Sequence, residues 1–213
     1  MPNYVRNIIK MKGIANLDLF RTYKNGEKGF DFNKLIPMPE SLDVSDGSES
    51  ERGIAAALQK ICKIQFDTPF GELNCRVVVA KDFFKEEERE EYEQLGMKYI
   101  ENIIKYGHPT WYGWACENWG TKWNACDTRI YGEDEVQFDT AWSNPEPVIK
   151  KLAEKYPDAQ IFHEWSDEDY GNNCGERTYD GHCWTETQDS DGSEEAINRA
   201  NNIWHYDEED EDE

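Results

Sequence analysis

The chain has 213 residues, of which 38% are hydrophobic and 13% aromatic, and it carries a formal net charge of −22. This length and aromatic content suit one elaborated domain with a buried core and exclude a chain that is disordered throughout. Apolar runs stay well short of the ~20 residues that span a bilayer, and the start shows no signal-peptide pattern. We therefore expect a cytoplasmic protein with no membrane partner.

The first part of the chain predicts one strand followed by an excursion. Apolar, β-branched residues at the centre of 4–12 indicate a first strand. An insertion over about 13–80 should follow, because two prolines within 36–42 exclude regular structure there. Inside this insertion, 53–62 is a short-helix candidate and 73–79 a strand candidate.

The middle of the chain has clearer periodicity. Apolar residues at three- and four-residue spacing predict an amphipathic helix over 82–106, ended by the glycine that follows it. Alternating residues flank a short turn and predict a β-hairpin of 124–131 with 135–142. An Asn-Pro start then predicts a second helix over 144–156, and a strand follows at 159–165.

In chain order these elements run strand, helix, strand, strand, helix, strand. That order is the ferredoxin-like split βαβ arrangement, an α+β fold with an antiparallel sheet and two helices on one face. Residues 175–187 should add a C-terminal hairpin to the sheet. We therefore expect an elaborated ferredoxin-like domain over 1–190, a short helix over 191–206 and a disordered acidic tail over 207–213.

Charge is distributed unevenly along the chain. Residues 1–163 carry 27 acidic and 21 basic residues, a net of −6, whereas 164–213 carry 18 acidic and 2 basic residues, a net of −16. One interpretation is that this acidity only improves solubility. The other is that a dense negative surface steers the protein toward basic partners. Either way, direct binding of DNA or RNA is disfavoured.

One stretch, YGWACENWGTKWNACD over 112–127, is rich in aromatic residues and lies between the first long helix and the hairpin. Three interpretations are open: aromatic side chains that cap the core, a recognition surface, or a reaction centre. We select its polar and aromatic residues, together with three acids of a later loop, as candidate partner-binding residues: Trp114, Glu117, Asn118, Trp119, Lys122, Trp123, Asp167, Glu168 and Asp169.

We predict no catalytic residues, no cofactor and no metal ligands. The six cysteines should be thiols in a reducing compartment, and no Cys-x-x-Cys pair is present. Cys174, His182 and Cys183 fall close together, but adjacent strand residues point to opposite faces and rarely bind one ion. The four histidines match no nucleophile, zinc-protease or phosphate-loop motif.

Several segments together resemble a known family. They are MPNYVRN, FDFNKLIPMPESL, YGWACENWGTKWNACD, FDTAWSNP and the Gly-Glu segment after Cys174. Over about 1–185 the chain resembles the YubB/Api-like family of phage and conjugative-plasmid proteins, which are described as carrying a ferredoxin-like domain. The resemblance implies a mobile-element origin and this fold, and it implies no active site.

Our leading hypothesis is therefore a non-enzymatic accessory protein of a phage or plasmid. It would present an acidic, nucleic-acid-like surface to a host or defence-system protein with a basic nucleic-acid-binding surface, such as a CRISPR or restriction effector. The alternative is a small-ligand-binding protein or enzyme whose pocket is the aromatic stretch 111–127. Its polar groups would be Glu117, Asn118, Lys122 and His163.

Overall fold

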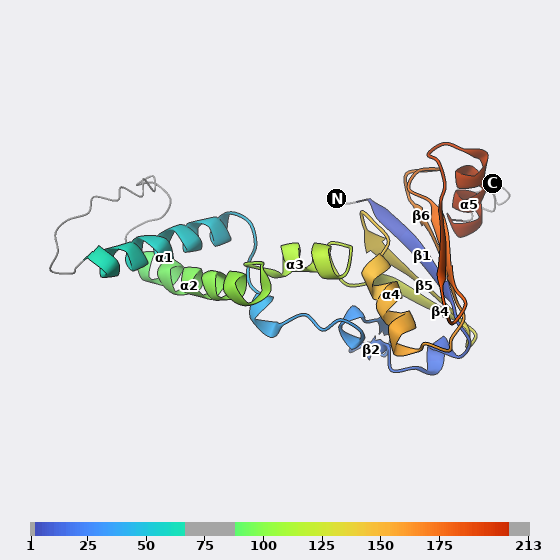
Figure 1. Ribbon diagram of the computed structural model, residues 1–213, viewed down its shortest axis with the longest axis horizontal. Coiled ribbons are helices and arrows are strands. Elements are labelled where there is room, and N and C mark those ends of the chain that lie inside the picture. Colours follow the sequence, from blue (N-terminus) through green and yellow to red (C-terminus); the bar gives the residue numbers. More distant parts are fainter. Residues whose placement is uncertain (1–2, 67–87, 205–213) are drawn as a thin grey trace. The chain divides into compact units, whose positions relative to one another are not determined.

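The computed structural model describes residues 3–66 and 88–204, and the side chains of 59–66 are outside the description. The chain forms two compact units. The sheet unit comprises residues up to Pro37 and from Ala115 onward, and the helical unit is Met38–Trp114 (Figure 1). The helical unit therefore begins and ends later in the chain than the insertion expected over about 13–80.

The sheet unit is built on six strands in the order β4-β5-β1-β6-β7-β8, and every neighbouring pair is antiparallel. The first four strands in this order are those of a split βαβ unit, so the expected fold class is confirmed. β7 and β8 extend the sheet as the predicted C-terminal hairpin. The strands are β1 (Tyr4–Lys10), β4 (Cys126–Tyr131), β5 (Glu135–Ala141), β6 (Ile161–Asp167), β7 (Gly175–Tyr179) and β8 (Trp184–Gln188).

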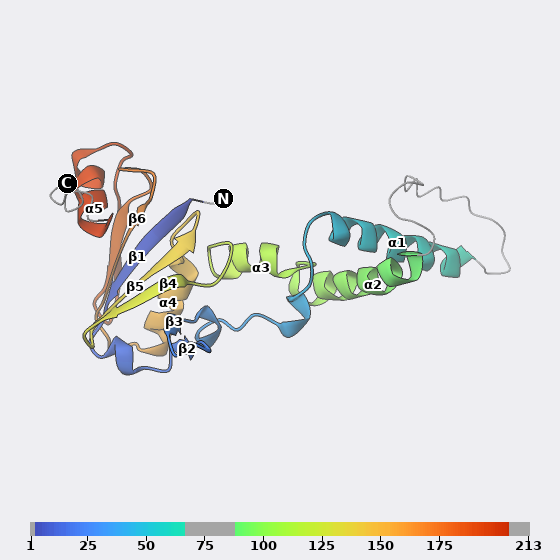
Figure 2. The ribbon, with the colours of Figure 1, turned by 180° about the vertical axis from the view of Figure 1, so that it is seen from behind.

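Two helices flank this sheet from opposite sides, as both ribbon views show (Figures 1 and 2). α4 (Glu146–Lys155) is the helix predicted over 144–156, and it buries its apolar face. α5 (Glu194–Trp204) is the predicted short C-terminal helix. The Arg6 guanidinium lies 3.9 Å from the ring centroid of Trp204, so the face of β1 that carries Arg6 is the one that α5 covers.

The opposite face of the sheet holds an aromatic core. Phe138 of β5 stacks on Phe30 at 4.9 Å between ring centroids, and Phe32 packs edge-on against both rings. Phe30 ends a small second sheet formed by β2 (Phe20–Thr22) and β3 (Lys28–Phe30). The insertion expected over about 13–80 thus contributes core residues to the sheet unit. It also contains three short 3₁₀ helices: Ile14–Asn16, Phe32–Lys34 and Glu40–Leu42.

One of the two helices expected on the sheet belongs to the helical unit instead. The helix predicted over 82–106 is seen in its described part as α2 (Arg89–Tyr106), and it ends at Gly107 with φ 79° as expected. It belongs to the helical unit rather than to the sheet unit, so α4 is the one of the two expected helices that the sheet unit contains. Amphipathicity indicates that one face of a helix is buried, but not which element covers it.

α2 packs instead on α1 (Ser48–Phe66), which includes the helix candidate 53–62. The two helices approach closely where Gly96 meets Gly53: a Cβ built at Gly96 would lie 1.8 Å from the Gly53 carbonyl oxygen. Tyr99 is fully buried and its hydroxyl donates to the Ser45 carbonyl oxygen at 2.8 Å. The strand candidate 73–79 and the acidic tail 207–213 lie outside the described residues. None of the helices in the described ranges is long and apolar enough to cross a membrane.

Candidate partner-binding surface

The aromatic stretch divides into a buried half and a half that reaches the surface. Its start is a short helix, α3 (Trp111–Asn118), where we expected a loop. Trp114 and Trp119 are 7% and 3% exposed, and the Trp119 indole N–H donates to the Ile36 carbonyl oxygen at 2.9 Å. Trp119 also packs edge-on against Phe32. These two tryptophans therefore serve the core in this structure.

The second half of the stretch is attached to the end of β5. The Thr121 hydroxyl donates to the Ala141 carbonyl oxygen at 2.8 Å and accepts from the Ala141 N–H at 3.1 Å. Gly120 has φ 77°, and a Cβ there would lie 2.7 Å from Cδ of Pro147, so glycine suits this turn. The Ser143 hydroxyl donates to the Gly120 carbonyl oxygen at 2.5 Å. Lys122, which follows Thr121 in the chain, is thereby placed beside the end of β5.

Lys122 lies against two tryptophans. Its ammonium nitrogen is 4.9 Å from the ring centroid of Trp123 and 4.7 Å from that of Trp142. Both distances are within the range of a cation–π interaction. Trp142 is 44% exposed although it directly follows β5, whereas Trp123 is half-buried. Together these three residues form what we call the tryptophan clamp.

The backbone of Trp142 is in the left-handed region, with φ 72°. This conformation costs a bulky residue on the order of 1–3 kcal/mol and persists only where the surroundings impose it. Here the Trp142 N–H donates to the Asn3 carbonyl oxygen at 2.9 Å. The side-chain amide of Asn173 donates to the Trp142 carbonyl oxygen at 3.3 Å. Contacts from both sides thus hold the backbone of an exposed tryptophan.

The candidate acid Asp167 connects these contacts. It is 6% exposed and accepts hydrogen bonds from the side chains of Asn3 and Asn173, at 3.3 and 3.2 Å, and from the Asp169 N–H at 2.9 Å. Its carboxylate is therefore used inside the protein. Glu168 and Asp169 are exposed at the same end of the sheet. The aromatic stretch contacts Trp142 through Lys122, and the acidic loop contacts it through Asn173, which Asp167 binds. The sequence indicated Trp142 only as a strand position.

The loop between β8 and α5 packs beside the β6–β7 loop and carries further acidic residues. The Gly192 N–H donates to the Gly171 carbonyl oxygen at 2.8 Å, and the Asp191 carboxylate accepts from the Asn173 N–H at 3.1 Å. The Tyr170 hydroxyl donates to Asn201 of α5 at 2.6 Å. Five exposed acidic residues lie on these two loops and on the first turn of α5, and we call them the acidic rim: Glu168, Asp169, Asp191, Glu194 and Glu195.

The two arginines of this region offset little of the exposed acidic surface, because Arg177 is buried and Arg199 is largely buried among carboxylates. Arg177 is 1% exposed and its guanidinium stacks on Trp165 at 4.6 Å. Arg199 forms ion pairs with Asp189 at 2.6 Å, with Glu176 at 3.0 Å and with Glu164 at 3.5 Å. The exposed charged residues between 164 and 204 are consequently all acidic: the rim, Asp180 and Glu186.

Burial favours the neutral forms of one histidine and two cysteines in the sheet unit. His163 is fully buried, with its Nε2 atom 3.0 Å from the Asn7 amide oxygen, and burial together with the charge of Arg177 holds its pKa well below 6.5. Burial and neighbouring acids raise the pKa of Cys126 to about 11, so little thiolate forms at neutral pH. Burial also raises the pKa of Cys174. In the described ranges no three His, Cys, Asp or Glu side chains gather as a metal site.

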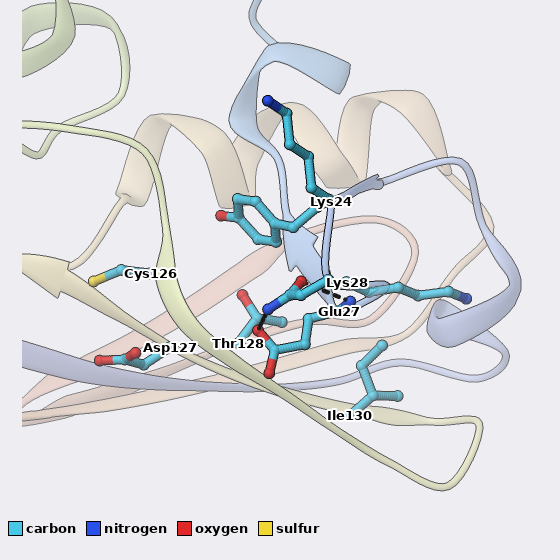
Figure 3. Close-up of a pocket in the computed structure, with 9 residues that line it drawn as sticks. Lys24, Glu27, Lys28, Cys126, Asp127, Thr128 and Ile130 are labelled. Carbon is cyan, nitrogen blue, oxygen red and sulfur yellow. Dashed lines mark hydrogen bonds between the residues drawn. The ribbon is translucent and has the colours of Figure 1, made fainter.

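The far end of the aromatic stretch borders an open hollow of about 950 Å³ (Figure 3). Cys126, Asp127 and Thr128 line it from β4, and Lys24, Glu27 and Lys28 line it from the β2–β3 hairpin. None of the tryptophans of the stretch lines this hollow. Binding of a small ligand can therefore be tested at this hollow. The hollow is not lined, however, by the tryptophans on which the small-ligand alternative is based.

Comparison with known proteins agrees with the sheet unit. Residues 118–207 match a family model described as the ferredoxin-like domain in Api92-like protein. Over this segment the chain is similar to the ferredoxin-like domain of Api92-like proteins. The expected family resemblance is confirmed for this segment. The matched segment includes the tryptophan clamp and the whole acidic rim, whereas β1, which lies between β5 and β6 in the sheet, is outside the matched residues.

Two further comparisons complete the findings. The crystal structure of the protein api92 from Yersinia pseudotuberculosis aligns with 91% of this chain and 100% of its own, with 10% sequence identity and a TM-score of 0.39. A search of curated proteins finds no match.

Proposed function

We propose that this protein is a non-enzymatic accessory protein of a phage or plasmid that binds another protein through the acidic rim. The observation that carries the proposal is the sign of the exposed charge: between residues 164 and 204 every exposed charged side chain is acidic, because Arg177 is buried and Arg199 is largely buried. A surface of one sign steers association with a surface of the opposite sign.

The partner that fits this charge is a host or defence-system protein whose basic surface normally binds nucleic acid, such as a CRISPR-type or restriction effector. Carboxylates that occupy a basic groove replace phosphates, and the release of counterions favours binding as it does for DNA. The burial of His163 and the raised pKa of Cys126 support a binding role over a catalytic one.

The test is displacement of DNA from a purified effector. A Cas9-type nuclease and a restriction endonuclease would each be loaded with labelled duplex at low salt and titrated with the full-length protein. We expect displacement of the duplex from at least one of them, and this displacement should weaken as salt rises. The double variant Glu168→Gln/Asp169→Asn should displace the same fraction of duplex only at a protein concentration at least about three-fold higher.

The matched control removes the same two charges elsewhere. Glu133 and Asp158 are exposed residues outside the acidic rim, near the opposite end of the sheet. Glu133→Gln/Asp158→Asn should leave displacement unchanged. If both double variants weaken it equally, net charge alone is responsible and the rim is not the binding surface. If the wild-type protein displaces duplex from neither effector, this partner class is wrong.

A further inference from the structure

The tryptophan clamp has features that core packing does not explain. A core residue would hide its ring, yet Trp142 is 44% exposed. A residue free to relax would leave the left-handed region, yet the Asn3 and Asn173 contacts hold Trp142 there at φ 72°. A rigid, half-exposed tryptophan is typical of the residues that dominate binding energy in protein interfaces.

The clamp already accommodates a cation. The Lys122 ammonium lies within 5 Å of the ring centroids of both Trp123 and Trp142, at 4.9 and 4.7 Å. This contact shows that the indole of Trp142 is oriented so that a positively charged group can approach it. The same ring is therefore suited to a cation supplied by a partner.

The acidic rim lies close enough to share that partner group. The Trp142 N–H bonds to the Asn3 carbonyl oxygen on one side of β1, and the Glu168 N–H bonds to the Tyr4 carbonyl oxygen on the other side. With β1 between them, the two backbones are about two strand spacings apart, or ~10 Å. A long basic side chain that stacks on Trp142 can thus belong to a segment that also meets Glu168 and Asp169.

We infer that Trp142 is the anchor of this surface and that it stacks on an arginine side chain of the partner; this inference rests on the proposed function. Arginine fits better than lysine for two reasons. Its planar guanidinium is weakly hydrated and stacks on aromatic rings, and its donors bind carboxylates in pairs. The rim then supplies the charge attraction, and Trp142 supplies the preference for arginine.

The test uses two labelled peptides of equal length and charge, an oligoarginine and an oligolysine, titrated with the full-length protein at low salt. The variant Trp142→Leu should weaken binding of the arginine peptide about two- to five-fold and binding of the lysine peptide by a smaller factor, because a guanidinium stacks on an aromatic ring better than an ammonium does. Trp142→Phe keeps an aromatic ring and should retain part of the preference. The control Tyr131→Leu removes a 49% exposed aromatic residue at the end of β4, beside the start of β5, and it should change the binding of neither peptide.

The outcomes separate this inference from the proposed function. If Trp142→Leu weakens both peptides equally, or neither, Trp142 is not an arginine anchor. The binding role would survive that result, provided that Glu168→Gln/Asp169→Asn weakens both peptides. If the wild-type protein binds neither peptide, or if the rim variant has no effect, the rim proposal fails together with the inference. Circular dichroism of each variant checks that the fold is unchanged.

Discussion

At the scale of single residues, burial decides what a charged group does. Asp167 belongs to an acidic run, yet it is 6% exposed and its carboxylate accepts three hydrogen bonds. Glu168 follows it directly and is exposed. Asp167 therefore acts as a positioning residue for Asn3, Asn173 and, through them, Trp142. Adjacent acids with the same charge thus have different roles.

His163 gives a prediction about pH. Burial and the charge of Arg177 lower its pKa in the folded protein well below 6.5, whereas in the unfolded chain the pKa stays near the ordinary value of about 6.5. Below that pH the unfolded chain binds more protons than the folded protein. The contribution of His163 to the free energy of unfolding is therefore fully present above pH 6.5 and should fall at lower pH, by at most about 1.4 kcal/mol per pH unit.

Urea unfolding of wild type and His163→Gln between about pH 7 and pH 5 checks this expectation. The variant should show a flatter dependence of unfolding free energy on pH than wild type. His182→Gln is the matched control, because His182 is exposed, and it should keep the wild-type dependence. Equal slopes for wild type and His163→Gln would contradict the prediction.

At the scale of elements, one arginine attaches α5 to the sheet. Arg199 of α5 pairs with Asp189 before the helix, with Glu176 of β7 and with Glu164 of β6. The Asp189 side chain is only 4% exposed. Arg199→Met would leave the buried Asp189 carboxylate without its cation, whereas Glu164 would keep its 3.7 Å pair with Lys10. Removing one partner of a buried pair costs about 3–5 kcal/mol. Since Arg199 is itself 15% exposed, we expect the lower end of that range.

Chemical unfolding measures this loss of stability, and hydrogen exchange of the α5 amides shows where it acts. The matched control is Lys150→Met, which breaks an exposed ion pair with Glu146 on α4. Such pairs contribute about 0–1 kcal/mol, so the control should be nearly neutral. If the two variants lose similar stability, Arg199 does not hold α5 in place.

Local sequence patterns predict where the helices and strands lie better than they predict which of these elements pack together. Alternation and apolar runs were enough for β1, β5 and β6, because each strand has a buried face that its own sequence records. The helical start of the aromatic stretch was missed, since the run Trp-Tyr-Gly-Trp has no helical periodicity. The position of Trp142 depends on Asn3 and Asn173, which are far away in sequence. Hydrogen bonds of this kind leave no local signal.

At the scale of the whole molecule, the proposed binding surface and the helices α1 and α2 belong to different units. The acidic rim, the tryptophan clamp and the aromatic core of Phe30, Phe32 and Phe138 all belong to the sheet unit. The helical unit has its own core around Tyr99. The surface therefore depends on contacts made within the sheet unit.

This division leads to a prediction about deletion. Residues 38–114 replaced by a short Gly-Ser linker should leave the sheet unit folded, because the two cut ends are already near each other: the Trp119 indole donates to the Ile36 carbonyl oxygen at 2.9 Å. A flexible linker of a few residues can span such a gap. The shortened protein should unfold cooperatively in urea and keep the near-ultraviolet circular dichroism of packed tryptophans. A non-cooperative transition, or loss of that signal, would show that the sheet unit requires the helical unit to fold.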